Sequence, residues 1–473
     1  MRMPRQFWLH TEFPVTILRP PSPVTTLARK LRLHDYFALG FGTMIGVGWL
    51  VLMDDWLARG GPLGAALAFA LGCLILLPVG YVYGKWVQRL PDASGEAAYT
   101  AQVFPPLVSF FTGWIMLLAY FIVCPWEAVA IGKLAAYLFP SLDSFKLYSV
   151  AGQPVFLPRL LLGVALTILL TFLNYRGIRA SARFQGWITS AVLILFAVAA
   201  FFSLRRGSFS NIHPAFRSTP FLSILLTLQI VPYFMTGFES IPKVAEEAHP
   251  GFPPRSFFRA IVLALFIGAG FYVLSIVAVS FAAPWQSLLG KSFATAIAFE
   301  HAIGSHWPVA LIVIAGICGL CQCFNGNFVA ASRLLFSFGR RATIPSGFAS
   351  IHPRHQTPHV AVLAISAGTL LGVFLGDALL VPVTEVGSMA SAFGWLAACL
   401  SLALVESLPR VRLVALLGAL VSALLFAMKL FPIFPGHFSR DEWFALSLWL
   451  LIGILLHALS PVIARRNASS STT

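Results

Sequence analysis

The segment Gly40-Phe-Gly-Thr-Met-Ile-Gly-Val-Gly48 combines four glycines with apolar residues in the first long hydrophobic stretch of the chain. Each glycine weakens a helix by about 1 kcal/mol relative to alanine. In a membrane, where the backbone finds no water, a broken helix is tolerated only where it lines a cavity or is buried in protein. The pattern therefore predicts a broken helix at a binding site, with main-chain groups holding the ligand.

Such a break exposes two kinds of main-chain group. N–H groups near Gly46 and Gly48 lie at the positive end of the following helical piece and suit a carboxylate. Carbonyls near Met44 and Ile45, and those of a second broken segment, can accept hydrogen bonds from an ammonium, so a zwitterionic amino acid matches both. The candidate substrate-binding residues are Thr43, Met44, Ile45, Gly46, Gly48, Trp49, Tyr233, Phe234, Thr236 and Gly237. For the aromatic members the alternative is packing against lipid or the protein core.

Four acidic residues, Asp54, Asp55, Glu127 and Glu239, fall inside predicted membrane spans. Charged groups are costly in a bilayer and are functional candidates by default. We expect Glu239, next to the second break, to take up and release a proton, because burial disfavours its charged form. The other three would favour amines or cationic amino acids over acidic ones, because a negative cleft of low dielectric attracts cations.

Each acid also has a structural alternative. The two aspartates would face a solvated external vestibule and pair with Arg59. Glu127 would pair with Lys133, and Glu239 would make a purely structural hydrogen bond. Charged residues of two predicted cytoplasmic loops form either an inner gate or a solvated surface: Glu246, Glu247, Arg333, Arg340 and Arg341.

The composition indicates the elements that must position these residues. Hydrophobic residues make up 58% of the chain and charged residues 10%, with a mean hydropathy of +0.84; a soluble globular protein has about 25% charged residues. Hydrophobic stretches of membrane-crossing length predict an all-α membrane protein with twelve spans. The stretch 105–139 is either one long tilted helix or a helix with a re-entrant piece. The spans are 36–58, 62–88, 105–139, 159–174, 186–204, 221–245, 257–283, 307–338, 359–376, 380–406, 411–432 and 443–464.

The sixth span repeats the character of the first, because Pro232, Gly237 and Pro242 interrupt it. Paired interrupted segments in matching positions are the best sequence indication of a transporter's midplane site. Their spacing predicts an inverted repeat of five plus five helices with broken helices 1 and 6. The expected organisation is a tail over 1–35, a first repeat over 36–204, a second repeat over 221–406, two further helices over 411–464 and a tail over 465–473.

The basic residues give the orientation. The chain has 32 Lys and Arg and a net charge of +15. Most of them fall on one side if both termini are cytoplasmic, which satisfies the positive-inside rule. We expect an integral protein of the cytoplasmic membrane with no cleavable signal peptide. Because the basic residues are spread over many short loops, nucleic acid is not an expected partner.

Cofactor and metal sites are not predicted. The run Cys318-Gly-Leu-Cys321-Gln-Cys323 imitates a metal or redox motif, but no histidine or acid lies nearby to complete a zinc site. We interpret these cysteines as small apolar residues of a helix. The glycine run at 40–48 lacks the preceding strand that a dinucleotide loop requires.

Four motifs, in this order and spacing, resemble the amino acid–polyamine–organocation (APC) superfamily over roughly residues 30–410. Gly42-Thr-Met-Ile-Gly46-Val-Gly48 is similar to its first-helix signature. Thr236-Gly-Phe-Glu-Ser240, followed by Glu246-Glu-Ala-His-Pro250, resembles its sixth helix and the loop after it. The segments before the third helix and around the eighth helix also resemble it: Pro91-Asp-Ala-Ser-Gly-Glu-Ala-Ala-Tyr99, and Asn325 with Ala331-Ser-Arg333 through Pro345 to Thr357-Pro358.

The resemblance implies a leucine-transporter-like fold and an amino acid permease, not an enzyme. It implies a small-molecule substrate, an amino acid or amine, carried in symport or exchange; a proton is the expected coupling ion because of Glu239. Two features depart from the family. Trp49-Leu50 follows Gly48 where Ile-Phe is frequent, and residues 184–204 lack the lysine that some members have in the fifth helix. The coupling ion therefore does not follow from that lysine.

Two other function classes remain alternatives. A major-facilitator-type transporter also has twelve spans, but its repeat is six plus six, with a long central loop that this chain lacks. A non-transporting sensor or a membrane enzyme on a transporter-like scaffold is the other, although no zinc-protease motif or nucleophile elbow is present. The sequence does not predict the particular substrate or the oligomeric state.

Overall fold

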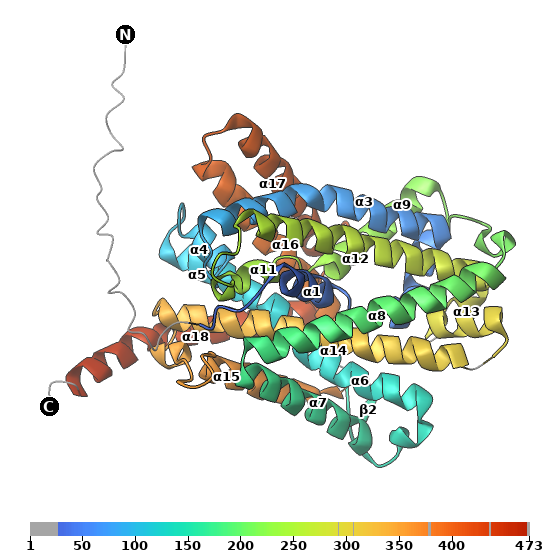
Figure 1. Ribbon diagram of the computed structural model, residues 1–473, viewed down its shortest axis with the longest axis horizontal. Helices are drawn as coiled ribbons and strands as arrows, with labels where there is room; N and C mark the ends of the chain where they lie inside the picture. The colour runs from blue at the N-terminus through green and yellow to red at the C-terminus, as the bar shows by residue number, and fades with distance from the viewer. Residues whose placement is uncertain (1–26, 292, 306, 377–379, 435–436, 471–473) are drawn as a thin grey trace, which may run out of the picture.

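The computed structural model describes residues 27–470 except 292, 306, 377–379 and 435–436. The chain is mostly helical, and the long helices run roughly along the long axis of the molecule (Figure 1). A hairpin of β1 (Lys146–Val150) and β2 (Gln153–Phe156) projects at one end of the bundle. The helices are α1 (Leu33–Met44), α2 (Gly48–Val51), α3 (Met53–Arg89), α4 (Glu96–Thr100), α5 (Pro106–Phe121), α6 (Val123–Leu138), α7 (Leu157–Arg176), α8 (Ile178–Arg206), α9 (Pro220–Leu228), α10 (Val231–Met235), α11 (Ser240–Lys243), α12 (Arg255–Ala282), α13 (Ala294–Ile303), α14 (Trp307–Arg340), α15 (His359–Val373), α16 (Leu380–Val405), α17 (Pro409–Leu430) and α18 (Arg440–Ser470).

Within the described residues, nine helical stretches are long and apolar enough to cross a membrane. They are α3, the α5–α6 pair, α7, α8, α12, α14, α16, α17 and α18, and α15 is a shorter apolar helix. Many large apolar side chains on these helices are exposed, such as Leu161, Ile168 and Leu420. Soluble monomers rarely expose large contiguous apolar patches, so these side chains fit contact with lipid.

The predicted span 36–58 is divided, because α1 ends at Met44 and α2 starts only at Gly48. The third piece of this span is the beginning of α3, which changes direction at Gly61. Gly61 has φ +64°, and a Cβ there would lie 2.7 Å from the backbone nitrogen of Arg217. Gly61 therefore separates the predicted spans 36–58 and 62–88.

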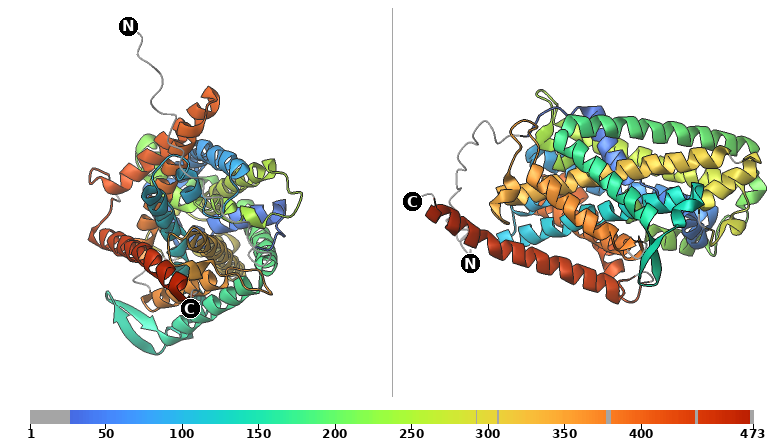
Figure 2. Two further views of the ribbon diagram at one scale, coloured as in Figure 1. Left: turned by 90° about the vertical axis from the view of Figure 1, so that its left-hand side faces the viewer. Right: turned by 90° about the horizontal axis from the view of Figure 1, so that it is seen from below.

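The predicted span 221–245 is also divided, into α9, α10 and α11. The predicted stretch 105–139 is one long helix, because α5 and α6 are joined only by Ile122, whose backbone is right-handed helical. The last two helices lie at the periphery: α17 packs on α16 and α3, and α18 runs along the outside of the bundle (Figure 2). The two broken segments thus lie among unbroken helices.

Candidate functional site

The two broken segments touch each other at the centre of the bundle. Gly237, with φ +142°, lies so close to the first break that a Cβ on it would be 2.6 Å from the nitrogen of Met44. The Ser240 hydroxyl donates to that of Thr43 at 3.3 Å. Only glycine allows both this conformation and this approach, so the residue fixes how the two breaks cross.

The first break leaves several N–H groups without helical partners. Ile45 is extended, and its N–H closes α1 on the Phe41 carbonyl. Among the described residues no acceptor is recorded for the N–H of Gly46, Val47, Gly48 or Trp49. A buried N–H group without a partner is costly, so this run of donors suits an anion.

Two carbonyls of the first break, those of Met44 and Ile45, already have donors. The Tyr272 hydroxyl donates to the Met44 carbonyl at 2.8 Å, and the Gln322 amide donates to the Ile45 carbonyl at 2.8 Å. At the second break no donor is recorded, within the described chain, for the carbonyls of Phe234, Met235 and Thr236. Acceptors for an ammonium are therefore found at the second break, and the predicted role of the Met44 and Ile45 carbonyls is weakened.

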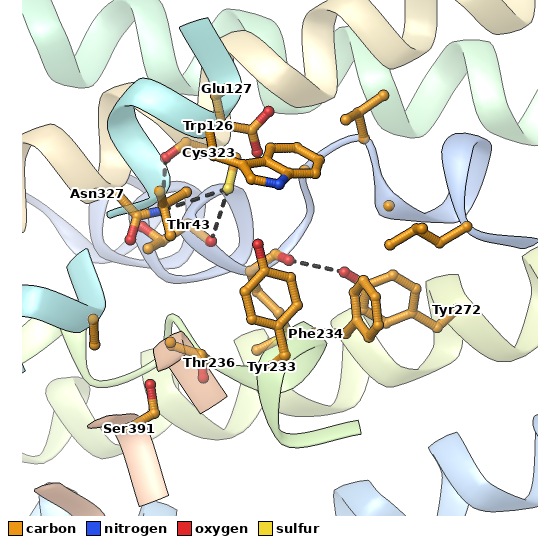
Figure 3. Close-up of a pocket in the computed structure, with 18 residues that line it drawn as sticks. Thr43, Trp126, Glu127, Tyr233, Phe234, Thr236, Tyr272, Cys323, Asn327 and Ser391 are labelled. Carbon is orange, nitrogen blue, oxygen red and sulfur yellow. Dashed lines mark hydrogen bonds between the residues drawn. The ribbon is translucent and has the colours of Figure 1, made fainter. Parts of the chain in front are cut away.

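A cavity of about 40 Å³ lies at the crossing of the two breaks. Trp126, Glu127 and Cys323 lie on one side of it, and Tyr233, Phe234 and Thr236 on the other (Figure 3). Because a single water occupies about 10–15 Å³ on this measure, the cavity is too small for an amino acid, and lining side chains must move to admit one. The lining residues are Thr43, Met44, Gly46, Val47, Gly48, Leu52, Ala119, Val123, Trp126, Glu127, Tyr233, Phe234, Thr236, Tyr272, Cys323, Asn327, Gly387 and Ser391.

The cavity brings together most of the residues predicted to bind substrate, but not all. Thr43, Met44, Gly46, Gly48, Tyr233, Phe234 and Thr236 line it, whereas Ile45, Trp49 and Gly237 do not. Trp49 is fully buried and its ring packs edge-on against Phe196 and Phe271. Its indole thus belongs to the core, which was the alternative for the aromatic candidates.

Two adjoining glycines leave space that larger residues would fill. A Cβ on Gly46 would lie 2.6 Å from Glu127 Oε1, and a Cβ on Gly48 would lie 2.5 Å from Phe234 Cε1. Side chains from two other elements therefore reach the backbone of the first break. Substitution at either glycine would push these side chains away from it.

Glu127 is the one predicted acid that lines the cavity. It is 2% exposed, and no partner is recorded in the described chain for its Oε2. The alternative pairing with Lys133 is not found, because Lys133 lies instead in a separate outer cavity. Glu127 thus presents a carboxyl oxygen at the site.

Glu239 lies next to the cavity but does not line it. Its Oε2 accepts a hydrogen bond from the N–H of Gly237 at 2.9 Å, so the side chain supports the second break itself. Its Oε1 is buried and has no recorded partner among the described residues. The structural hydrogen bond that was the alternative for Glu239 is present, and one oxygen remains for a proton.

The predicted acids of the first span lie outside the cavity. Asp55 lines an outer cavity of about 290 Å³ and pairs with Arg59 at 2.8 Å, which was the alternative for this residue. Asp54 lines neither cavity and is half-buried. The outer cavity also contains Lys133 and a Lys429–Glu385 pair. Its acids are therefore balanced by cations, which removes the basis for a negative access path.

Four side chains line both cavities and separate them: Leu52, Trp126, Tyr233 and Phe234. Three of them are aromatic and bulky, and the ring of Phe234 also packs against Trp56. A substrate that moves from the outer cavity to the inner one must displace them.

Sequence reasoning missed several residues of the cavity, chiefly Trp126, Tyr272, Cys323, Asn327 and Ser391. Cys323 belonged to the cysteine run that we interpreted as inert, and its thiol lies 3.3 Å from the Thr43 carbonyl. Asn327 lies one turn further along α14 and donates to the Cys323 carbonyl. These residues belong to unbroken helices, where the sequence has no signal that separates a cavity face from a core face.

Side-chain amides of α8 and α14 contact α1 and the break that follows it. The Gln185 amide donates to the carbonyls of Ala38 at 3.3 Å and Gln322 at 3.1 Å. The side-chain oxygen of Gln322 in turn accepts from the Thr189 hydroxyl at 2.9 Å. The Gln322 amide of α14 also donates to the Ile45 carbonyl, so a neutral donor meets one oxygen that the end of α1 would otherwise offer to a cation.

On the side of the breaks away from the outer cavity, buried ion pairs join separate elements. Lys243 of α11 pairs with Glu96 of α4, both fully buried, and the Tyr83 hydroxyl donates to Glu96 at 2.6 Å. Arg333 of α14 pairs with Glu247 at 3.2 Å, again fully buried. Removing one partner of a buried pair leaves an uncompensated charge, so these pairs hold this end closed.

A second, more exposed set of pairs lies beside them. Arg341 contacts Asp92 at 2.8 Å, and Arg340 contacts Glu246 at 2.6 Å. Burial opposes ionisation of Asp92, but Arg341, the Ser94 side chain and Arg340 together hold the pKa of that carboxyl below its usual value. The charged residues of the predicted loops form a connected network, which corresponds to the inner-gate alternative.

Comparison with known proteins supports one protein family. The family described as amino acid permease matches residues 31–456. The branched-chain amino acid permease BcaP of Bacillus subtilis (strain 168) is 24% identical, over 79% of this chain and 80% of its own length. The vacuolar cationic amino acid transporter 4 of Arabidopsis thaliana is 28% identical, over 79% and 63%. The human cystine/glutamate transporter is 27% identical, over 76% and 70%.

Proposed function

The chain belongs to the amino acid permease family, and from this premise we propose that it carries an amino acid or a related amine across the membrane by alternating access. It is an integral, multi-pass membrane protein and a transporter, not an enzyme. The observation that carries the proposal is the meeting of two broken helices at one cavity. N–H groups of one break and carbonyls of the other have no partner recorded among the described residues.

Each break binds a different charged group of the substrate. The carboxylate binds the N–H groups of Gly46, Val47 and Gly48, because this run of donors has no other acceptor recorded in the described chain and helix starts suit anions. The ammonium binds the carbonyls of Phe234 and Thr236. The side chain then points toward the walls of the cavity.

The membrane arrangement proposed here has twelve spans. The nine long stretches, the shorter α15 and the two broken segments make up this number. Residues 36–204 and 221–406 form the two inverted repeats, 411–464 the two added helices, and 1–35 and 465–473 the tails. Both termini are cytoplasmic and the membrane is the cytoplasmic membrane, as the distribution of basic residues favours.

Coupling to protons is the mode that the contacts favour. Glu239 and Glu127 each have a buried oxygen with no partner recorded among the described residues, and each adjoins a break. The alternative, sodium, is disfavoured because the Gln322 amide already donates to the Ile45 carbonyl at the end of α1. The Glu239 carboxyl takes up a proton when one end is open and releases it when the other end is open.

The walls of the cavity determine which substrate side chain fits. The names of the relatives cover apolar, cationic and acidic amino acids, so the family does not decide. The walls are largely aromatic and aliphatic, which suits a neutral side chain. A second candidate is a cationic side chain or amine, because Glu127 directs a carboxyl oxygen at the cavity.

Uptake by proteoliposomes tests the proposal. The purified protein, reconstituted with an inward proton gradient, is expected to accumulate at least one labelled amino acid or amine from a panel of neutral, cationic and acidic compounds. Collapse of the gradient should reduce accumulation. Ligand binding by thermal shift without any uptake or exchange would instead indicate a sensor. The proposal would be overturned if the protein neither bound nor took up any amino acid or amine.

A further inference from the structure

A basic cavity lies at the end of the bundle closed by the ion pairs, away from the substrate site. It measures about 570 Å³. Three segments distant in the sequence build it: residues 29–35 before and within α1, residues 179–183 of α8, and residues 249–250. The lining residues are Arg29, Lys30, Leu31, Arg32, His34, Asp35, Arg179, Ala182, Arg183, His249 and Pro250.

Within the part of the chain that the structure describes, no carboxylate balances the basic side chains of this cavity. Its single acid, Asp35, already accepts from the N–H of Arg32 at 2.8 Å and contacts His34. No ion pair is recorded in the described chain for the five basic side chains, although Arg29 donates to a backbone carbonyl. On the neighbouring part of the same end, Arg333, Arg340 and Arg341 all have carboxylate partners.

The cavity opens along an exposed face of α8. Arg179, Arg183 and Trp187 follow one another at intervals of four residues, so they share that face, and all three are exposed. Trp187 is 79% exposed, and Ile194, two turns further, is 62% exposed. Figure 1 shows α8 on the outside of the bundle. Along this face, charged side chains are followed by an indole and then by an aliphatic side chain. A membrane has the matching order from the charged headgroups through the interface to the acyl chains.

We propose that this cavity binds the phosphate of an anionic phospholipid, with Arg179 and Arg183 as the main contacts. Basic pockets between helices at the cytoplasmic surface suit such headgroups, and each basic residue near the surface contributes about 1 kcal/mol. The lipid phosphate supplies the negative charge that the cavity lacks. Its acyl chains lie along Trp187 and Ile194. The proposal does not depend on transport.

The test is a lipid titration followed by the thermal unfolding midpoint of the purified protein in neutral detergent. Short-chain phosphatidylglycerol is the probe, short-chain phosphatidylcholine the neutral control, and inorganic phosphate the soluble-anion control. Phosphatidylglycerol should raise the midpoint in a saturable way and the two controls should not. An equal effect of inorganic phosphate would mean a site for a soluble anion and would overturn the lipid as occupant.

Variants locate the site. Arg179→Gln with Arg183→Gln should weaken the apparent affinity for phosphatidylglycerol roughly thirtyfold, about fivefold for each arginine. If the double variant does not fold, each single variant should still weaken the apparent affinity for phosphatidylglycerol about fivefold. The matched control is Arg410→Gln with Arg412→Gln, two exposed arginines at the start of α17. This start lies at the same end, because Glu406 contacts Arg89 at the end of α3. Equal losses in both double variants, or none in either, would contradict the proposal.

Discussion

The glycines of the first break act through the space that they leave. At Gly46 and Gly48 that space is occupied by Glu127 and Phe234, side chains of other elements that approach the bare backbone. The backbone N–H groups can bind a carboxylate only if this approach stays open. Two positions without a side chain thus control access to the donors.

We predict that Gly48→Leu abolishes uptake while the protein remains folded and inserted. The new side chain would collide with Phe234 and cover the N–H groups. The matched control is Gly270→Leu, at an exposed glycine of α12 where a Cβ would meet no atom within 4 Å. Proteoliposome uptake, with elution in size-exclusion chromatography as the folding check, decides. Wild-type uptake in Gly48→Leu would refute the carboxylate site.

Glu239→Gln separates the two roles of this residue. The glutamine oxygen can still accept from the Gly237 N–H, so the break should keep its shape, whereas the proton site is lost. We expect substrate exchange to persist and the pH dependence of net uptake to flatten. The measurement is initial uptake rate against external pH. A wild-type profile in Glu239→Gln and a flat one in Glu127→Gln would move the proton role to Glu127.

At the scale of elements, the sequence predicts where helices break better than which way the pieces face. Glycine and proline act locally, so both breaks follow from composition. The face of a piece depends on the turn before it. Leu52, between α2 and α3, is not helical (φ −114°, ψ 13°), so Gly48 and Asp55 do not lie on one regular helix and the face of Asp55 does not follow from their spacing. Tyr272 and Asn327 lie on unbroken helices, so their place at the cavity could be predicted only from how those helices pack.

The Gln322 amide at the end of α1 predicts an uptake that does not need sodium. It donates to the Ile45 carbonyl, and Gln185 of α8 in turn donates to the main-chain carbonyl of Gln322. At fixed pH and membrane potential, replacing sodium by choline should leave the initial rate unchanged. A fall toward background in choline, restored by sodium alone, would show that a cation enters despite these contacts.

The loop before α4 and the end of α14 are joined by ion pairs whose pH response can be predicted. Because the pKa of Asp92 is lowered in the folded protein, its contribution is complete above the ordinary value near 3.9 and is lost as the pH falls through the lowered value. Asp92→Asn should therefore destabilise by about 0.5–1 kcal/mol throughout pH 5–8. Wild type and variant should converge only in stronger acid.

Thermal midpoints in detergent at a series of pH values measure this difference. Asp441→Asn, an exposed acid at the start of α18, serves as the control and should have little effect. Convergence of wild type and Asp92→Asn between pH 5 and 7 would contradict the prediction. It would also make Asp92 a candidate for the pH dependence of uptake near neutrality.

For the whole molecule, the two cavities differ in how their charges are balanced. The outer cavity balances Asp55 and Glu385 with cations, while the inner cavity contains only Glu127 among the predicted acids. Selection by charge would therefore occur at the inner site and not at the entrance. The sequence placed these acids together, since it could not show which cations of other helices lie beside them.

We predict that lysine, arginine or putrescine competes with a labelled substrate better than glutamate or aspartate. Glu127→Gln should weaken competition by the cations roughly tenfold, the effect of one charged hydrogen bond, and leave leucine unchanged. Asp55→Asn, at a paired and partly exposed site, should change the ranking little. Stronger competition by the acidic amino acids, or no change in Glu127→Gln, would refute cationic preference.

The contact between Gly237 and the Met44 nitrogen has a consequence for exchanging parts between relatives. A segment grafted from another permease brings its own backbone path at the break, and even a small displacement of that path produces a clash at this point. The two broken spans, 36–58 and 221–245, must therefore be exchanged together, although most of the first half of the chain separates them. Chimeras that exchange both together should fold, and chimeras that exchange either alone should not.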